Sequence, residues 1–398
     1  MGSRPQYDAF VITAPGLERL VVDELKALGC DNARAVEGGV TFTASRRALY
    51  EANLHLRTAS RVVVRAAEFD AKAFHELERR SGKVAWESFI SPSLPVSLRV
   101  TCRKSRLYHS DAVAERLAGA IMSRVTGGRL APEESDAASQ LILVRLLHDR
   151  CTISVDSSGP LLHLRGYRQA LAKAPMRETL AAAALLATGW RGDTPLIDPM
   201  CGSGTIPIEG ALIARRIAPG LGRQFAFESW PDFDSRLWGE VVAAAKARMI
   251  ARAPAPITGS DRDAGAIQAA VSNADRAGVL GDVELSERPI SSMQPSAMPG
   301  WVVSNPPYGV RVGERDRLRN LYAQLGNVLR AKCPGWRFAL LSADPQLERQ
   351  LRFRLEPILR TSNGGIDVRL VAGEVAAGPD DGPALDATDT SAAQRYPS

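Results

Sequence analysis

The sequence predicts an α/β protein in which a small α+β front region precedes a larger domain built on a parallel sheet. Three observations predict this fold class. An apolar run at residues 195–198 ends in an acid and breaks into a glycine-rich loop, and helical apolar spacing follows. A second short apolar strand, at residues 301–304, ends in Asn-Pro-Pro-Tyr. Residues 9–66 alternate short strand and helix patterns, which is typical of an α+β domain.

The first motif has the features of a cofactor loop. Gly202 and Gly204 allow the backbone to come close to a ligand. Asp198 would repel a dinucleotide pyrophosphate, whereas a carboxylate at this strand end suits the ammonium of an amino-acid-bearing cofactor such as S-adenosylmethionine. A glycine loop alone would also fit a tight strand-to-helix turn. The loop residues predicted to contact the cofactor are Asp198, Pro199, Cys201, Gly202, Gly204 and Thr205.

The second motif predicts a site for an exocyclic amino group. The two prolines fix the backbone, so that the side-chain oxygen of Asn305 and the carbonyl of Pro306 can face one ligand as a pair of acceptors. Tyr308 offers a ring face for a planar base that has left its stack. A strand-ending Asn-Pro turn alone can be structural, but two strand-end motifs in this order favour chemistry. The predicted catalytic residues are Asn305, Pro306, Pro307 and Tyr308.

The front region is predicted to contain alternating strands and helices. Strands are expected at residues 9–14, 39–42, 60–66, 96–102, 141–147, 151–156 and 161–164. Helices are expected at residues 17–28, 46–56 and 71–81. A hairpin turn at residues 148–150 is expected to connect two of the strands.

Residues 99–129 of this region carry an excess of basic side chains. Within them, cations lie beside an aromatic ring and a histidine at a strand-to-helix junction, where phosphate contacts and stacking would suit RNA. A solvated helix start would have the same composition. Two further arginines in the following linker could also contact RNA or be solvated. The candidate RNA-binding residues are Arg103, Lys104, Arg106, Tyr108, His109, Arg165 and Arg168.

The rear domain continues the strand and helix alternation. Strands are expected at residues 195–197, 256–261, 283–285, 301–304, 337–342, 354–359 and 366–372, and helices at 175–187, 206–216, 264–277 and 317–332. The aromatic insertion at residues 218–254 is interpreted as a satellite core.

The second rear strand supplies another candidate cofactor contact. It ends in Asp261, whose two ionised oxygens match the vicinal hydroxyls of a ribose. Arg262 would lie beside the adenine, and Asp263 would cap the next helix. The residue that faces the adenine amine stays open, because Glu287 has an uncertain offset from the third strand.

These motifs resemble the large-subunit rRNA guanine-N2 methyltransferases typified by RlmL, of the UPF0020/RNA methylase family. The resemblance spans roughly residues 7 to 373 and rests on segments 15–18, 53–61, 104–109, 162–168, 174–180, 198–205 and 305–308. It implies a class I (Rossmann-like), S-adenosylmethionine-dependent methyltransferase domain behind a ferredoxin-like/THUMP RNA-binding region, and it favours RNA contact by the basic stretch. Some relatives carry a second methyltransferase domain, for which this chain is expected to be too short.

The resemblance implies a domain division. We expect a ferredoxin-like piece at residues 6–60, a THUMP-like domain at 61–164, a linker at 165–174, the methyltransferase domain at 175–373 and a disordered tail at 374–398.

Bulk properties narrow the class of protein. The 398 residues allow two or three domains, and no apolar run approaches a membrane span. Five scattered cysteines predict reduced thiols in a cytoplasm and no zinc site. A net charge of +6 permits a nucleic-acid partner without requiring one.

The function expected is transfer of a methyl group to guanine N2 in large-subunit (23S) rRNA or its precursor particle, by a monomer that needs no metal. Because the displacement at a sulfonium needs mainly alignment, no buried histidine or carboxylate pair is required. Four alternatives stay open. They are a tRNA guanine-N2 methyltransferase, a DNA adenine or cytosine methylase, a protein glutamine methyltransferase, and an inert RNA-binding assembly factor.

Overall fold

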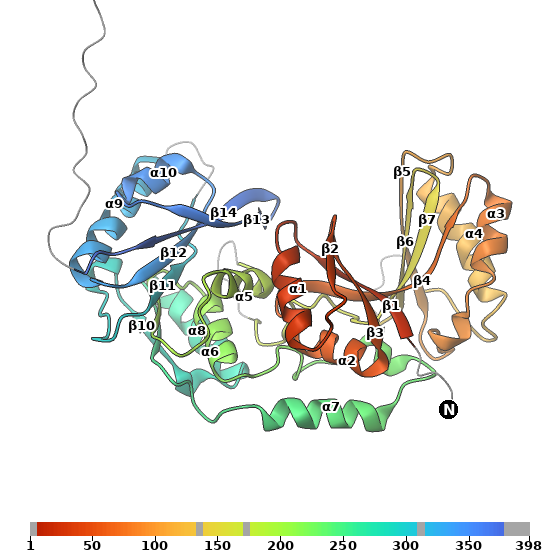
Figure 1. Ribbon diagram of the computed structural model, residues 1–398, viewed down its shortest axis with the longest axis horizontal. Coiled ribbons are helices and arrows are strands. Elements are labelled where there is room, and N and C mark those ends of the chain that lie inside the picture. Colours follow the sequence, from red (N-terminus) through yellow and green to blue (C-terminus); the bar gives the residue numbers. More distant parts are fainter. Residues whose placement is uncertain (1–5, 133–137, 170–175, 309–314, 378–398) are drawn as a thin grey trace, which may run out of the picture.

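The computed structural model describes residues 6–132, 138–169, 176–308 and 315–377. Within these ranges, two seven-stranded sheets lie side by side along the long axis of the molecule (Figure 1). The expected tail lies largely outside the described residues, as do Pro175 and the last residues of the expected linker. Among the described helices, none is both long and apolar enough to cross a membrane.

The front sheet has the order β2-β3-β1-β4-β7-β6-β5 and is antiparallel except between β5 and β6. Its strands are β1 (Gln6–Thr13), β2 (Arg34–Val36), β3 (Gly39–Ser45), β4 (Ala59–Asp70), β5 (Val96–Arg103), β6 (Gln140–Leu147) and β7 (Arg150–Asp156). Its helices are α1 (Glu18–Ala27), α2 (Arg46–His55), α3 (Phe74–Ser81) and α4 (Ser110–Met122).

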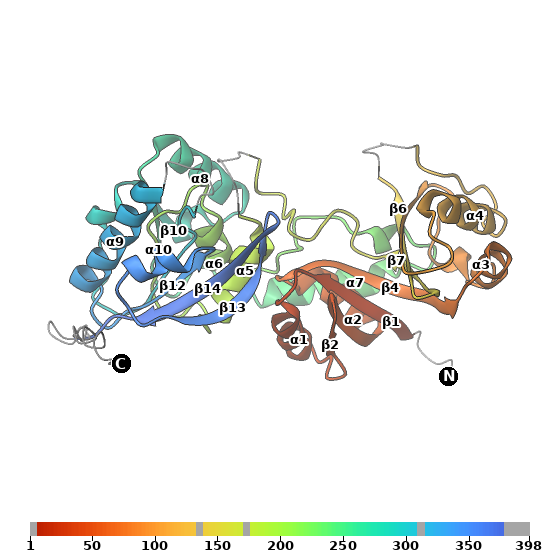
Figure 2. The same cartoon turned by 90° about the horizontal axis from the view of Figure 1, so that it is seen from above.

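The 12-residue strand β4 joins the two expected front domains into one sheet. It pairs with β1 through its first half and with β7 along most of its length. The expected boundary at residues 60 and 61 therefore falls inside a strand, and the sheet is continuous across it. Figure 2 shows β4 running from the α1–α2 layer to the α3–α4 layer.

Two expectations for the front region need correction. Residues 161–164 form a turn instead of a strand, because β7 pairs with β4 only from Val63 onward and this segment reaches the open edge before Val63 without a strand register. Leu162 is buried there, and its N–H donates to the Ser60 carbonyl at 2.9 Å. The short strand β2 was not predicted, since its three residues are all exposed and show no apolar alternation.

The rear sheet has the order β10-β9-β8-β11-β12-β14-β13, with only β14 antiparallel to its neighbours among the described strands. Its strands are β8 (Leu196–Asp198), β9 (Ile257–Asp261), β10 (Val283–Glu287), β11 (Trp301–Ser304), β12 (Arg337–Ser342), β13 (Glu356–Asn363) and β14 (Ile366–Glu374). Its helices are α5 (Glu178–Ala187), α6 (Thr205–Ala214), α8 (Ala264–Arg276), α9 (Arg315–Lys332) and α10 (Pro345–Gln350), and α7 (Ser235–Ala247) lies between α6 and α8 in the chain.

Helices cover both faces of the rear sheet, as a parallel sheet requires. Val303 of β11 packs in a core with α5 and α6, whereas its neighbour Val302 packs in a second core with α9. The alternation of side chains along a strand produces these two cores. The strand order reverses between β8 and β11, and ligands of open α/β sheets bind outside the carboxyl ends of strands at such a point.

The aromatic insertion packs on the front half rather than forming a satellite of the rear domain. The rings of Phe227 and Tyr50 stack with centroids 4.4 Å apart, and Trp238 meets Phe227 edge-on at 5.2 Å. Asp232 accepts a hydrogen bond from Arg46 at 2.5 Å. Helix α7 consequently lies along the base of the front domain (Figure 1), and the two halves share one aromatic core.

Candidate active site

The cofactor loop begins at the buried carboxyl end of β8. Asp198 is 2% exposed, and its Oδ1 accepts hydrogen bonds from the Ser304 hydroxyl at 2.6 Å and the Met200 N–H at 3.1 Å. Within the described part of the chain, no hydrogen bond reaches Oδ2. Since Ser304 ends β11, this contact joins the two sequence motifs directly.

The environment of Asp198 suits a cationic ligand group. The pKa of its carboxyl is raised to about 7, because burial and, to a smaller extent, the Asp261 carboxylate outweigh the lowering by its two hydrogen bonds. An ammonium group bound beside this buried carboxyl, which has no cationic partner among the described residues, would stabilise its ionised form. Burial also raises the pKa of the Cys201 thiol, so this residue is a neutral part of the wall.

The glycines of the loop have different roles. Gly202 has φ +53°, and a Cβ there would meet nothing within 4 Å, so open space lies beside its backbone. Gly204 has φ +84°, and a Cβ would approach Ala270 of α8 at 2.9 Å. Gly202 therefore leaves room for a ligand, whereas Gly204 allows the loop to pack on α8. Pro199 is buried in the same loop.

Asp261 supports the loop as well as bordering the site. Its two oxygens accept from the N–H groups of Gly202 and Asp263, each at 3.0 Å, and Asp263 caps α8 as expected. Arg262 is exposed beside it. Glu287 ends β10 in register with Asp261, which places it at the same edge of the sheet. These carboxylates retain acceptor capacity for hydroxyl or amino groups of a ligand.

The end of β11 carries an unsatisfied acceptor. Oδ1 of Asn305 is buried and has no hydrogen-bond partner among the described residues. Such an orphaned oxygen costs free energy on the order of 1–3 kcal/mol, which a ligand donor would recover. Pro306 is buried and Pro307 is exposed. Tyr308 is half-buried, and its hydroxyl accepts from Asn363 Nδ2 at 2.7 Å, which orients the ring.

The fit to S-adenosylmethionine follows from these observations. Asp198 can accept from its ammonium, Gly202 leaves backbone space, and Asp261 offers acceptors to its ribose. The orphaned oxygen of Asn305 lies at the end of the neighbouring strand. Within the described residues, no cluster of three or more His, Cys, Asp or Glu side chains could hold a metal ion.

Arg165 and Arg168 make internal contacts, whereas we expected them to contact RNA or to be solvated. Arg165 is 7% exposed, and its guanidinium donates to the carbonyls of Leu162 and Arg57 and lies 3.5 Å from Glu209. Arg168 donates to the Thr205 hydroxyl at 2.9 Å and pairs with Glu178 at 3.3 Å. Arg168 of the linker therefore contacts the end of the cofactor loop through Thr205.

Several positioning residues were missed by the sequence analysis. Arg276 donates to the Tyr167 carbonyl at 2.8 Å, and Asn273 donates to the Ser203 carbonyl at 3.1 Å, so α8 also fixes the loop. Glu209 is fully buried and accepts from the Tyr167 hydroxyl at 3.1 Å. A lone glutamate inside the apolar helix α6 was the available signal, because a buried charge requires a partner.

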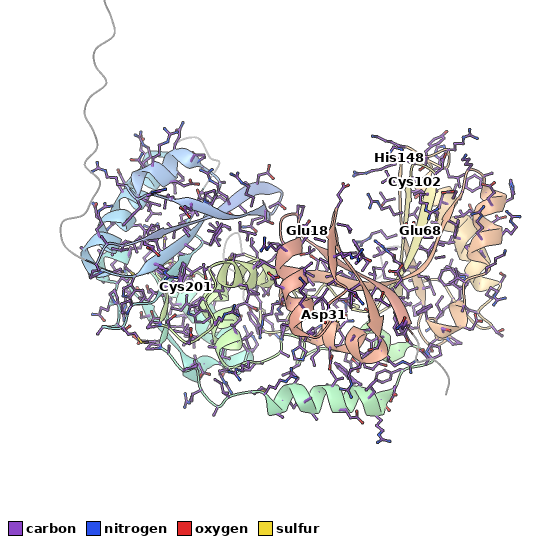
Figure 3. The ribbon with its side chains drawn as sticks, in the orientation of Figure 1. Glu18, Asp31, Glu68, Cys102, His148 and Cys201 are labelled. Atoms are coloured by element: carbon purple, nitrogen blue, oxygen red, sulfur yellow. The ribbon has the colours of Figure 1, made fainter. Side chains whose placement is uncertain are left out.

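The basic stretch of the front half is exposed as expected. Arg103, Lys104 and Arg106 make no side-chain ion pair within the described residues, and His109 is exposed. Tyr108 is 68% exposed, and its ring lies 4.0 Å from that of His109. Figure 3 shows the neighbouring Cys102 and His148 at one end of the molecule and Cys201 of the cofactor loop in the other half.

Family models match three segments of the chain. The RMKL-like methyltransferase domain matches residues 165–370, the RlmL ferredoxin-like domain residues 8–63 and the THUMP domain residues 71–156.

Individual relatives extend over most of the chain. A Synechocystis protein named "Putative RNA methyltransferase slr0064" is 35% identical over 92% of this chain and 96% of its own length. The ribosomal RNA large subunit methyltransferase K/L of Syntrophotalea carbinolica is 37% identical over 92% of this chain but 53% of its own. The crystal structure of SMU.472 complexed with S-adenosylhomocysteine has a TM-score of 0.84 and 29% identity, covering 94% and 99% of the two chains.

Proposed function

The chain belongs to the RMKL-like methyltransferase family, and from this premise we propose that it methylates the exocyclic N2 of a guanine in large-subunit rRNA, with S-adenosylmethionine as the methyl donor. The model of the methyltransferase domain matches about half of the chain. The Synechocystis relative aligns with 92% of the chain and over 96% of its own length.

One observation carries the proposal for an exocyclic amine. The orphaned Oδ1 of Asn305 lies at the end of β11, next to the strand that supplies Asp198. An amino group on a flipped base would donate to this oxygen and to the Pro306 carbonyl, so that both hydrogens are held and the lone pair is oriented. Tyr308 would supply the stacking surface, held by its bond from Asn363.

The cofactor supplies an electrophilic methyl group on a sulfonium. The protein contributes alignment: Asp198 holds the amino-acid end, and Asp261 holds the ribose. Because the nucleophilic nitrogen needs orientation more than a strong base, the absence of a histidine from this set of residues is compatible with the chemistry.

The front half supports an RNA substrate. The exposed cations Arg103, Lys104 and Arg106 lie next to Tyr108, which suits phosphate contact combined with base stacking. The THUMP match covers these residues. We propose that this surface holds the RNA at a distance from the modified base, and that the chain works as a cytoplasmic monomer.

The choice of rRNA follows the names of relatives. The chain spans about half the length of the K/L methyltransferases that it matches, which are 53% and 52% covered. Their whole activity is therefore a proposal for this chain. A tRNA guanine or a DNA adenine would present a similar amino group to Asn305, so both belong in the test.

The test offers labelled S-adenosylmethionine and purified protein to unmodified 23S rRNA, tRNA, duplex DNA and a release-factor peptide side by side, followed by nucleoside mass analysis. We expect N2-methylguanosine in the rRNA. Label confined to tRNA or DNA would contradict the proposed substrate. No label on any substrate, with cofactor binding intact, would favour the precursor particle or an inert assembly factor, and repeating the assay on precursor particles separates these two.

A further inference from the structure

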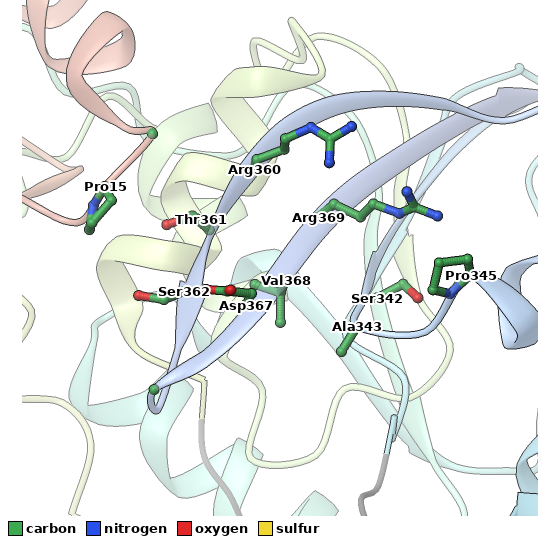
Figure 4. A pocket seen from close by; sticks show the side chains of 12 residues that line it. Pro15, Ser342, Ala343, Pro345, Arg360, Thr361, Ser362, Asp367, Val368 and Arg369 are labelled. Carbon is green, nitrogen blue, oxygen red and sulfur yellow. The ribbon is translucent and has the colours of Figure 1, made fainter.

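A cleft of about 690 Å³ lies between the two halves, and the site described above does not account for it. Its walls are the β13–β14 hairpin, the carboxyl end of β12 and the turn before α1 (Figure 4). Residues that line it include Gly16, Ser342, Arg360, Ser362, Asp367 and Arg369.

Two arginines are neighbours on adjacent strands of the hairpin. Arg360 of β13 is the direct cross-strand partner of Arg369 of β14, so both side chains lie on the same face. Figure 4 shows both guanidinium groups extending from that face in the same direction. Like charges directly opposite each other destabilise a strand pair unless anions offset them.

Only one of these two charges is offset within the described residues. Glu348 of α10 is 5% exposed and accepts two hydrogen bonds from Arg369, at 2.8 Å and 2.5 Å. Arg360 is exposed and makes no ion pair with any described residue. Arg360 is therefore free to pair with a ligand anion, beside a second arginine that is fixed in place and on a face that also carries Asp367.

The next cross-strand pair on the same face, two residues toward the hairpin tip, has the chemistry of a ribose site. Ser362 is paired with Asp367 on the same face as the two arginines. A hydroxyl and a carboxylate offer one donor and several acceptors, which suit a 2′-hydroxyl group.

The cleft lies at the same edge of the rear sheet as the Asn-Pro-Pro-Tyr turn. Asn363 follows Ser362 directly, so its side chain leaves the other face of the hairpin, where its Nδ2 donates to the Tyr308 hydroxyl. Ser342 ends β12, the strand next to β11, so the cleft lies at the edge of the sheet that carries Asn305. A nucleotide chain whose base reached Tyr308 would place a neighbouring phosphate near this hairpin.

The front half forms the opposite wall. Gly16 has φ +86°, and a Cβ there would lie 1.8 Å from the Arg360 carbonyl oxygen, so the two backbones are in close contact. The Gly16 N–H donates to Glu18 at 2.7 Å, which turns that carboxylate toward its own backbone. A ligand in the cleft would therefore touch both halves of the protein.

We propose that this cleft binds the ribose-phosphate unit of the substrate RNA next to the target nucleotide, with the phosphate on Arg360 and the ribose hydroxyl at Ser362 and Asp367. This inference rests on the proposed RNA substrate and adds a second contact site to the basic stretch. Arg369, whose charge is offset by Glu348, forms a fixed part of the wall.

The experiment measures binding of a labelled, unmodified 23S rRNA transcript to full-length protein between 50 and 300 mM salt. Arg360→Gln removes the free charge, and Arg354→Gln removes an exposed arginine that precedes the same strand but does not line the cleft. We expect Arg360→Gln to weaken binding about fivefold to tenfold, and to reduce the slope of log affinity against log salt by roughly 0.7, the value for one phosphate on a single strand.

Both variants should retain the wild-type melting temperature and affinity for S-adenosylmethionine. Equal behaviour of the two variants would overturn the inference, as would a parallel loss of cofactor binding in Arg360→Gln. Because binding is measured directly, the result holds even if the wild-type protein fails to methylate the transcript, which would instead count against the proposed function.

Discussion

The two seven-stranded sheets of this protein present functional groups in opposite ways. The front sheet carries Arg103, Lys104 and Arg106 where β5 ends, all exposed and free of ion pairs within the described residues. The rear sheet carries Asp198 and Asn305 at the ends of β8 and β11, where polar atoms are buried. The front cations have no anion paired with them, whereas the buried Asn305 oxygen has no hydrogen-bond donor among the described residues.

This difference favours different roles for the two candidate sites. Exposed cations attract phosphates through long-range, salt-sensitive forces and select little. A buried oxygen without a donor is costly, so it discriminates strongly for a ligand that supplies the donor at that point. We therefore expect front-half variants to alter RNA affinity and its salt dependence, and rear-half variants to alter turnover or cofactor affinity.

The largest effect is expected at the rear site. Asn305→Ala removes the orphaned acceptor, and we expect kcat to fall about 10²- to 10³-fold, as for loss of a preorganised transition-state contact. The affinity for S-adenosylmethionine and for RNA should change less than about threefold. Single-turnover methylation and calorimetric cofactor binding measure the two quantities separately.

Asn305→Asp is the matched control, because it keeps an oxygen of the same reach. A partial recovery of kcat is expected with aspartate. Equal loss of cofactor binding and methyl transfer in Asn305→Ala would mean that the residue supports the fold of the loop rather than the substrate amine.

The front surface should show the next largest effect. Changing Arg103, Lys104 and Arg106 to glutamine removes up to three phosphate contacts, so the slope of log affinity against log salt should fall by about 2. Affinity at physiological salt should fall roughly thirtyfold to a hundredfold. Filter binding across a salt series measures both, and kcat at saturating RNA should stay near the wild-type value.

A control variant with the same charge change separates specific contact from net charge. Arg19, Lys26 and Arg34 are exposed on the front half away from that loop. If glutamine at these three positions weakens RNA binding as much as glutamine at Arg103, Lys104 and Arg106, the effect is one of net charge. The basic stretch would then be a solvated surface and not an RNA-binding site.

The sequence predicted the positions of the candidate site residues at strand ends better than the contacts that hold the surrounding loop in place. Asp198 and Asn305 follow short apolar strands, so their placement at one sheet edge follows from parallel strand order. Arg165 and Arg168 were expected on a surface, because a short arginine-rich linker has the composition of one. Their partners Glu209 and Glu178 belong to the helices that follow the linker, and the spacing of a pair across a loop follows no periodic pattern.

Contacts that no local sequence pattern shows also explain the two main differences between the expected and the observed fold. Strand β4 continues past an expected domain boundary because its pairing with β7 depends on residues some 90 positions later. The aromatic rings of the insertion have a clear burial signal, but their partner Tyr50 belongs to the other half. Periodicity predicts that a side chain is buried, and only tertiary contacts determine against what.

The pH dependence of cofactor binding tests the buried carboxyl. Burial raises the pKa of Asp198 to about 7, and only its ionised form attracts an ammonium. The affinity for S-adenosylmethionine should therefore rise roughly fifteenfold from pH 5.5 to pH 7, where the ligand amino group stays protonated. Calorimetry at both pH values measures this ratio, and Asp198→Asn should abolish the trend.

The same raised pKa has a consequence for the ligand-free protein. Because the carboxyl takes up a proton more readily folded than unfolded, its contribution to stability is complete below about pH 4 and is lost as the pH rises through 7. Asp198→Asn should therefore gain stability over the wild type at pH 8 and little at pH 4. A wild-type cofactor affinity that does not vary between pH 5.5 and pH 7 would remove Asp198 from the ammonium site.

The smallest effect is expected in the linker between the two halves, which holds the cofactor loop through a hydrogen bond. Thr205 begins α6, is 6% exposed, and accepts from Arg168 at 2.9 Å. Thr205→Val keeps the shape but removes the acceptor, which costs about 1 kcal/mol and should weaken S-adenosylmethionine binding roughly fivefold through a looser loop. Thr205→Ser keeps the hydroxyl and should bind like the wild type. If the serine variant instead loses as much as valine, the methyl group rather than the bond to Arg168 holds the loop, and the linker does not couple the two sheets at this point.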